Sequence, residues 1–194
     1  HDTRVWCISG NNFQNGQWRG DGSYYFSVYP HCWGWATWSR AWQYYDAKLE
    51  HWPLLRESDL LKTTFDLALE RQHWRAIWQA SYENSRNLTW WDYQWFLTCV
   101  VNGGLTALPN RNLVSNVGFG PDGTHTTTFA EPTVIDGPLG SLIHPAFLLR
   151  DIAADRYSFD HHFGGVAMRH SRRPLVRFKE RIRHRLHQLR FRSR

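Results

Sequence analysis

Short apolar runs separated by polar turns predict several strands along the chain. Residues 5–8 (VWCI) are apolar and stop at a Ser-Gly-Asn-Asn sequence, which is typical of a buried strand that enters a loop. Residues 24–29 alternate and predict a second strand. Two further short strands are predicted over residues 105–108 and 112–115.

Two longer segments carry apolar residues at helical spacing. Ser58 is a suitable N-cap for one helix over residues 59–80. A second helix is predicted over residues 91–101, and residues 102–104 (NGG) supply its C-terminal stop. The apolar positions of the first helix are Leu61, Phe65, Leu69, Trp74 and Trp78.

The remaining segments are less regular. Residues 30–42 are too aromatic for a plain loop and are interrupted by glycine, and residues 118–127 predict a glycine-rich polar loop. Residues 138–160 show little periodicity, and Pro145 is expected to open a short helix there. The length of the chain predicts a single domain, which we place over residues 1–168.

Residues 169–194 differ in composition and predict a basic tail. They contain 11 Lys and Arg residues against a single acid. The tail is predicted to be a basic amphipathic helix, which either binds an anionic membrane surface or stays a solvated arm. Its apolar stripe consists of Phe178, Ile182, Leu186 and Leu189.

The formal net charge of +6 comes from this tail, because residues 1–168 hold 12 basic and 16 acidic groups. A domain built to bind nucleic acid would spread positive charge over its folded surface, so we expect no nucleic-acid partner. The chain also has 12 Trp among its 31 aromatic residues. Such side chains fill cores and also stack against sugar rings and bases, so the composition permits a carbohydrate or nucleotide site.

Cysteine usage predicts a reducing compartment. Cys7, Cys32 and Cys99 are odd in number and widely spaced, which does not suggest a disulfide framework. No apolar run approaches the roughly 20 residues that span a bilayer, and the first residues do not resemble a signal peptide. We therefore expect a cytoplasmic location, peripheral to the inner face of the membrane if the tail binds there. Because the sequence does not start with Met, we also expect it to be part of a longer polypeptide.

Four stretches in a fixed order carry a family resemblance. They are residues 8–13 (ISGNNF), 29–38 (YPHCWGWATW), 91–95 (WDYQW) and 113–120 (LVSNVGFG), the last followed by residues 124–126 (THT). Together they resemble bacterial glycosyltransferases of the GT-A fold, in the broad family-2-like group that decorates surface polysaccharides. The resemblance covers about two-thirds of the chain.

The resemblance implies an α/β fold in which this chain is the C-terminal, acceptor-side portion. Members of the family place a nucleotide-binding half first, which closes with an acidic Asp-x-Asp metal motif. No such motif precedes residue 8 here, so the donor-binding half is expected upstream. The implied activity is transfer of a sugar from a nucleotide-sugar donor to a saccharide acceptor, with inversion and with Mn²⁺ or Mg²⁺ as cofactor.

Asp92 is the candidate catalytic base. An inverting transfer needs a carboxylate within hydrogen-bond reach of the attacking hydroxyl, and similar enzymes place it near the start of a helix below the acceptor. Asp92 stands at such a helix start, flanked by the candidate substrate-binding residues Trp91 and Tyr93. The alternative is an acid placed early in a helix for capping or for the helix dipole.

Further candidates for substrate binding lie in two other stretches. Trp33 and Trp35 flank Gly34, which lets the backbone approach a ligand while the indoles stack. The alternative is an aromatic core cluster, which is the interpretation we prefer for Trp38 and Trp42. Asn11 and Asn12 follow a strand end, where they either contact a sugar or form a turn.

One histidine is a candidate metal ligand. The resemblance places His125 where a late ligand would complete the metal site begun by the upstream acidic motif, with Asp122 as a weaker neighbour. The His161-His162 pair with His170 has no carboxylate or cysteine spacing of a zinc site, and predicts an exposed polar turn. The G-x-G-x-x-G letters at residues 118–123 lack the strand–turn–helix context that binds phosphate.

A different class of function stays open on the residues alone. A tryptophan-rich, non-catalytic carbohydrate-binding or interaction module, tethered by the basic tail, fits the same composition. It predicts that this chain binds saccharide by itself, without nucleotide or divalent metal.

Overall fold

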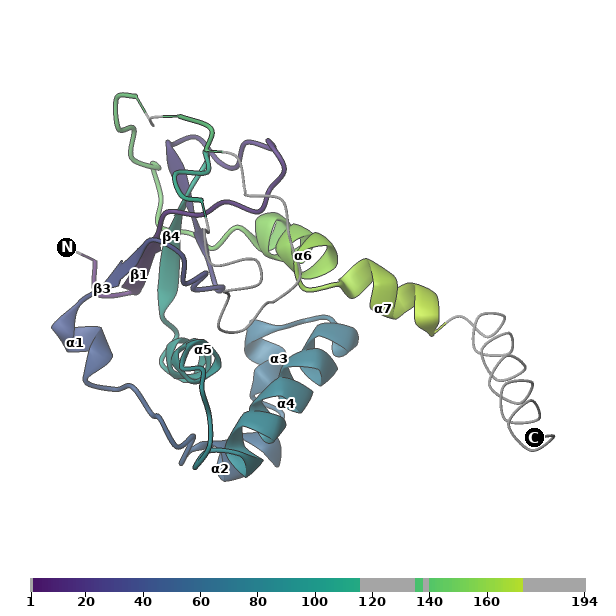
Figure 1. Cartoon of the computed structure of the whole chain (residues 1–194). Helices are drawn as coiled ribbons and strands as arrows, with labels where there is room; N and C mark the ends of the chain where they lie inside the picture. Colours follow the sequence, from purple (N-terminus) through teal and green to yellow (C-terminus); the bar gives the residue numbers. More distant parts are fainter. Residues whose placement is uncertain (1, 116–134, 138–139, 173–194) are drawn as a thin grey trace, which may run out of the picture.

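The computed structural model describes residues 2–115, 135–137 and 140–172. The described chain is a mixed α/β structure, in which one sheet lies against a group of helices (Figure 1). Its helices are α1 Ser39–Trp42, α2 Trp52–Arg56, α3 Leu61–Thr64, α4 Ala68–Glu83, α5 Asp92–Val101, α6 Ile152–His161 and α7 Gly165–Ser171.

Four strands form the sheet, in the order β2-β4-β1-β3. The two central strands, β1 (Val5–Ser9) and β4 (Leu105–Pro109), are parallel. The edge strands β2 (Tyr24–Ser27) and β3 (Trp35–Thr37) each run antiparallel to their neighbour. The predicted strands over 5–8, 24–29 and 105–108 are therefore confirmed to within two residues.

Helix α5 lies between the sheet and α4 (Figure 1). One side packs Trp95 and Cys99 against Trp6 of β1. Another side packs Phe96 and Val100 into the cluster shared with α4. A helix with apolar residues on nearly all faces is stable only when it is covered on several sides, so its sequence fits the central position.

The C-terminal end of α5 is closed by two glycines. Gly103 has a positive φ of 65° and its N–H donates to Val100 O, while the Gly104 N–H donates to Cys99 O at 2.8 Å. This is the Schellman pattern, which satisfies carbonyls that the helix leaves free. A Cβ on Gly104 would lie 2.6 Å from the indole of Trp6, so this position also lets β1 and α5 approach.

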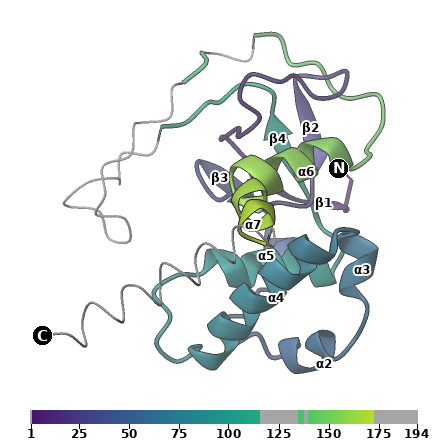
Figure 2. The same ribbon diagram turned by 90° about the vertical axis from the view of Figure 1, so that its right-hand side faces the viewer.

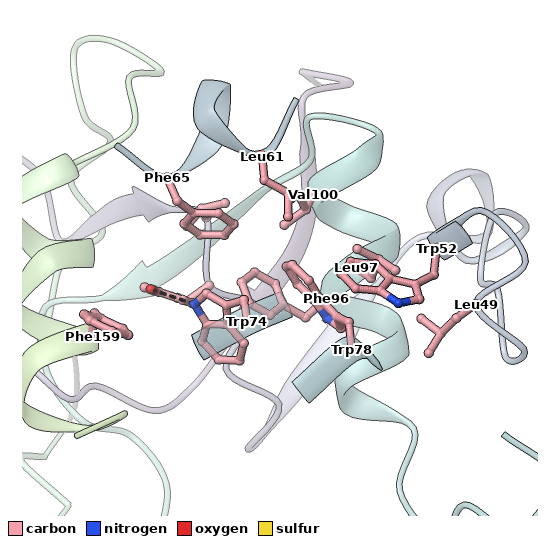
Figure 3. Close-up of a cluster of buried hydrophobic side chains, with 12 residues drawn as sticks. Leu49, Trp52, Leu61, Phe65, Trp74, Trp78, Phe96, Leu97, Val100 and Phe159 are labelled. Atoms are coloured by element: carbon pink, nitrogen blue, oxygen red, sulfur yellow. Dashed lines mark hydrogen bonds between the residues drawn. The ribbon is translucent and has the colours of Figure 1, made fainter. Parts of the chain in front are cut away.

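The main core is an aromatic cluster between α4 and α5 (Figure 3). Trp74 and Trp78 project from α4 onto Phe96 of α5, and all three are buried. The indole nitrogens are satisfied, since Trp78 Nε1 donates to Tyr93 O at 3.0 Å and Trp74 Nε1 donates to the hydroxyl of Tyr29 at 3.3 Å. The core therefore fixes the position of the first turn of α5.

The single helix predicted over 59–80 is wrong, because the chain forms α3 and α4 with a break between them. Phe65 has an extended backbone at the break and its side chain is fully buried against Trp78. The side chain of Arg71 donates to Phe65 O at 2.6 Å and to Asp66 O at 2.7 Å, which satisfies the carbonyls exposed there. Ser58 belongs to the turn after α2, where its hydroxyl donates to Leu55 O.

Two further predictions in the second half of the chain are wrong. Residues 112–115 form no strand; they are held instead by single hydrogen bonds, such as that from Leu113 N to Gly10 O. Pro145 opens no helix, and α6 begins seven residues later, where the Asp151 carboxylate caps it by accepting from Ala154 N at 2.8 Å. The Asp151 cap was a readable signal in a stretch with weak hydrophobic periodicity.

Helix α6 lies beside β2, and α7 continues from it toward α4 (Figure 2). Residues 169–171, at the start of the predicted tail, belong to α7, and Arg169 forms an ion pair with Asp160 of α6. The rest of the tail lies outside the described residues. No helix within residues 2–115, 135–137 or 140–172 is both long and apolar enough to cross a bilayer.

Candidate functional site

A small pocket of about 180 Å³ opens where three segments meet: the loop after β1, the segment after β2, and the first turn of α5. Four of the sequence-predicted site residues line it, which are Asn11, Trp33, Asp92 and Tyr93. The structure adds seven aromatic side chains, two of them histidines, that the sequence analysis did not single out as site residues: Phe13, Tyr29, His31, Trp74, Phe96, His162 and Phe163.

Asp92 is the first residue of α5 and is partly buried. Its carboxylate makes one hydrogen bond that belongs to the helix itself, accepting from Tyr93 N at 3.0 Å, and Trp91 at the N-cap makes no side-chain cap. Its charge contributes, after burial, to the raised pKa values of Tyr93 and Tyr45. The negative carboxylate interacts favourably with the dipole of α5, which is the alternative role given above for Asp92. It also lines the pocket.

Asn11 shapes the pocket by holding two segments together, and it is almost fully buried. Its amide nitrogen donates to the backbone carbonyls of His31 at 3.1 Å and Trp33 at 3.2 Å. The hydroxyl of Ser9 also donates to His31 O. The C-terminal end of β1 is thus joined by side chains to residues 31–33, so the sheet sets the position of the pocket wall.

Asn12 has a structural role away from this pocket. Its amide nitrogen donates to Pro109 O at 2.6 Å and its oxygen accepts from Gln14 N at 2.7 Å. Gln14 in turn donates to Ala154 O and Ser158 Oγ of α6. Of the two interpretations left open for Asn12, the structure supports the turn, and the same network anchors α6 beside the pocket.

Two histidines form one side of the pocket. His31 is buried, with Tyr29 and Phe163 stacked near its ring and Phe13 meeting it edge-on at 4.8 Å between centroids. His162 packs flat on Phe13, with ring centroids 3.6 Å apart. His162 directly follows α6. The exposed polar turn predicted there is only partly right, because the residue is exposed but its ring also lines the pocket.

Burial keeps the titratable neighbours of Asp92 neutral at pH 7. It lowers the pKa of His31 well below its usual value, with a smaller effect from His162, and it lowers the pKa of His162 as well. It raises the pKa values of the Cys32 thiol and the Tyr93 phenol. Among the described residues, no lysine or arginine lines the pocket. Asp92 is the only carboxylate among the described residues that line this aromatic pocket.

An aromatic surface continues from the pocket. Trp35 does not line it but stacks on Trp91, with centroids 4.8 Å apart, and Trp42 stacks on Tyr45 at 4.5 Å. Trp42 and Trp91 are 40% and 37% exposed, so the core position preferred for Trp42 is wrong. We call these four residues the indole platform.

Two other predicted features have structural explanations. Trp38 is 39% exposed rather than part of the core, and the guanidinium of Arg40 lies over its ring at 4.9 Å. Gly34 has a positive φ of 57°, and a Cβ there would meet Val114 at 2.3 Å. The backbone at Gly34 thus needs glycine because of a protein contact, and it does not line the pocket.

A buried acid lies behind the pocket. Tyr29 lines the pocket, and its hydroxyl donates a hydrogen bond to the carboxylate of Glu70 on α4. Burial raises the pKa of Glu70 to about 7. A second buried carboxylate, Asp155, is paired with Arg150 and accepts a hydrogen bond from Ser27 at the end of β2.

The remaining predicted residue, His125, lies outside the described residues, as does Asp122. In the described part of the chain, no three His, Cys, Asp or Glu side chains gather closely enough to hold a metal ion. A larger hollow of about 760 Å³ lies on the sheet face away from α5, lined mainly by apolar residues such as Ile8, Phe26 and Leu148. It contains none of the predicted catalytic or metal-binding residues.

Comparison with protein-family models, with curated proteins and with solved structures gives no match to this chain. The case for a function therefore depends on the chemistry of the pocket and on the sequence resemblance.

Proposed function

We propose that this chain is the acceptor-side part of an inverting, nucleotide-sugar-dependent glycosyltransferase, in which Asp92 is the general base. The observation that carries the proposal is a single carboxylate in a small, aromatic-walled pocket that no cation lines among the described residues. Aromatic faces suit the C–H surfaces of a sugar ring, and a carboxylate suits its hydroxyl groups.

The same chemistry favours the acceptor over the donor as the occupant. A nucleoside diphosphate carries negative charge and is normally bound by cations, metal ions or helix N-terminal amides. Here the charge next to the ligand is the negative charge of Asp92. The volume of about 180 Å³ also lies below the roughly 300–1,000 Å³ of sites for drug-sized ligands. A single sugar ring is therefore a better match than a nucleotide sugar.

In the proposed reaction, a hydroxyl group of the acceptor attacks the anomeric carbon of the donor sugar. The new C–O bond forms as the bond to the nucleoside diphosphate breaks, and the hydroxyl proton passes to the carboxylate of Asp92. The resemblance assigns the donor to an upstream half and a divalent cation to the leaving group, with His125 as one candidate ligand. It also motivates a cytoplasmic location, with the tail at an anionic membrane surface.

The test is transfer by the native full-length polypeptide that contains this sequence. Sugar transfer from a panel of labelled nucleotide sugars to saccharide acceptors is measured for the wild type and for Asp92→Asn. We expect a rate lower by about 10²- to 10⁴-fold in the variant, because the amide cannot accept the proton. The matched control is Asp59→Asn, at an exposed position paired with Lys62, which should keep the wild-type rate. Full activity in Asp92→Asn would remove this residue from the mechanism.

A non-catalytic saccharide-binding module remains the second candidate. The indole platform favours it, because two pairs of stacked rings, in which Trp42 and Trp91 are partly exposed, provide an aromatic surface for sugars without any reaction. This function predicts saccharide binding that persists in Asp92→Asn and no transfer with any donor. Transfer that depends on Asp92 would exclude it as the sole function.

A further inference from the structure

His31 has an unusual environment for a buried polar side chain. It is 7% exposed, and aromatic rings of Phe13, Tyr29, His162 and Phe163 surround it. Its Nε2 atom is buried and has no hydrogen-bond partner among the described residues. The backbone carbonyl of the same residue is well bonded, by Ser9 and by Asn11. The main chain is therefore fixed, while Nε2 of the imidazole lacks a hydrogen-bond partner among the described residues.

Such a group destabilises the folded protein. A buried donor or acceptor without a partner has lost its hydrogen bonds to water and gained none in return. An apolar ring such as phenylalanine would fill the same space between Phe13 and Phe163 without that cost. An imidazole at this position is thus unfavourable for stability, and its side chain lines the pocket that contains Asp92. These two facts together indicate a role in binding.

We propose that the His31 imidazole is a substrate-contacting residue that hydrogen-bonds a ring hydroxyl of the acceptor sugar. This inference rests on the proposed function for the occupant of the pocket, and it adds the residue that selects among neutral sugars. A site that hydrogen-bonds a particular hydroxyl discriminates strongly against analogues that lack it, because its own polar group is then left unpaired.

The division of chemistry in the pocket supports this assignment. Asp92, when ionised, only accepts hydrogen bonds, whereas a neutral imidazole donates through one nitrogen and accepts through the other. A sugar hydroxyl both donates and accepts, so neighbouring hydroxyls on one ring can satisfy both side chains. The close aromatic contacts of His31 leave its ring little freedom to turn.

The test measures binding of neutral monosaccharides to the full chain, without nucleotide or metal. The probes are the methyl glycosides of glucose, galactose and mannose together with their monodeoxy analogues, titrated by NMR. We expect the wild type to bind at least one of these sugars, and to lose on the order of 10-fold in affinity for the one deoxy analogue that lacks the contacted hydroxyl. Binding of none of the sugars by the wild type would overturn the inference.

Three variants separate binding from structure. His31→Phe should bind the parent sugar only as tightly as the wild type binds that deoxy analogue. The variant should bind the parent sugar and the deoxy analogue with equal affinity. Its melting temperature should equal or exceed that of the wild type. His31→Gln, which restores a hydrogen-bonding group, should regain part of the affinity. The matched control is His73→Phe, outside the pocket in contact with Trp74 and Phe159, which should bind sugars as the wild type does.

The outcomes are decisive for His31. If His31→Phe binds the sugars as the wild type does, or if it unfolds or melts at a clearly lower temperature, the imidazole is structural and the inference is wrong. Failure of the transferase proposal looks different. A chain that binds sugars through His31 but shows no Asp92-dependent transfer would keep this inference and remove catalysis. Transfer with an unchanged acceptor KM in His31→Phe would remove this inference alone.

Discussion

The core between α4 and α5 and the adjoining pocket are built from the same kinds of side chain, but they treat polar atoms differently. In the core, the indole nitrogens of Trp52, Trp74 and Trp78 all donate hydrogen bonds to protein atoms. In the pocket, His31 Nε2 has no such partner within the described residues, and the Asp92 carboxylate receives little beyond its own helix. Complete pairing stabilises a fold, whereas incomplete pairing next to a cavity leaves capacity for a ligand.

The strongest way to break this comparison is to remove a core ring. Trp78→Ala takes away a fully buried indole that packs on Phe96 and holds Tyr93 O. We expect the free energy of unfolding to fall by about 3–5 kcal/mol, measured by denaturant unfolding followed by circular dichroism. Loss of much less than this would show that α4 and α5 are not held by this cluster. Val166→Ala, at an exposed position on α7, is the control and should change stability little.

Glu70 of α4 links the core to the pocket through its hydrogen bond from Tyr29, and it should make the stability of the protein depend on pH. The folded-state pKa of Glu70 is raised from 4.5 to about 7 by burial. The contribution of Glu70 to the stability of the folded protein is therefore complete below pH 4.5 and is lost as pH rises through about 7. This loss lowers the free energy of unfolding by up to about 3 kcal/mol. Glu70→Gln keeps an acceptor for the Tyr29 hydroxyl and should abolish this fall.

The control for the pH experiment is Glu83→Gln at the exposed end of α4, which should keep the wild-type pH dependence. His31 and His162 act in the opposite window. Because burial lowers their pKa values, the stability they contribute is present above about pH 6.5 and is lost as pH falls. A Glu70→Gln variant with the same loss above pH 5 as the wild type would contradict the assignment.

The smallest expected effect sharpens the comparison most. Asp92→Asn should change the free energy of unfolding by less than about 1 kcal/mol, because within the described residues Asp92 contributes one local hydrogen bond and an interaction with the helix dipole. Thermal unfolding against wild type measures it. A loss comparable to that of Trp78→Ala would instead assign Asp92 to the fold and weaken its catalytic role.

The sequence predicted the elements that have strong local signals. The apolar run of β1 and the α5 helix with its glycine stop were found because their hydrophobic pattern and termini agree. The α3–α4 break was missed, since Phe65 keeps helical spacing in sequence and its extended backbone depends on Arg71 and on the core. Tertiary packing overrides the local pattern there.

The pocket was predictable only in part. Asp92, Trp33, Tyr93 and Asn11 lie in stretches that carry the resemblance, and the structure brings them together. His162 lies about 70 residues further along, and its position depends on how Gln14 anchors α6. No local pattern encodes that contact. His31 stood within the quoted 29–38 stretch, but its missing hydrogen-bond partner is visible only in three dimensions.

Gly104 connects the far end of α5 to the chemistry at its beginning. Helix α5 spans ten residues, or about 15 Å, and presents Asp92 at one terminus while the two-glycine stop fixes the other against Trp6. Because the helix is rigid, a displacement of its C-terminal end also moves its first turn. A methyl group added at position 104 would clash with Trp6 and displace α5. The Asp92 carboxylate, a helix length away from that methyl group, would move with the helix and change its position in the pocket.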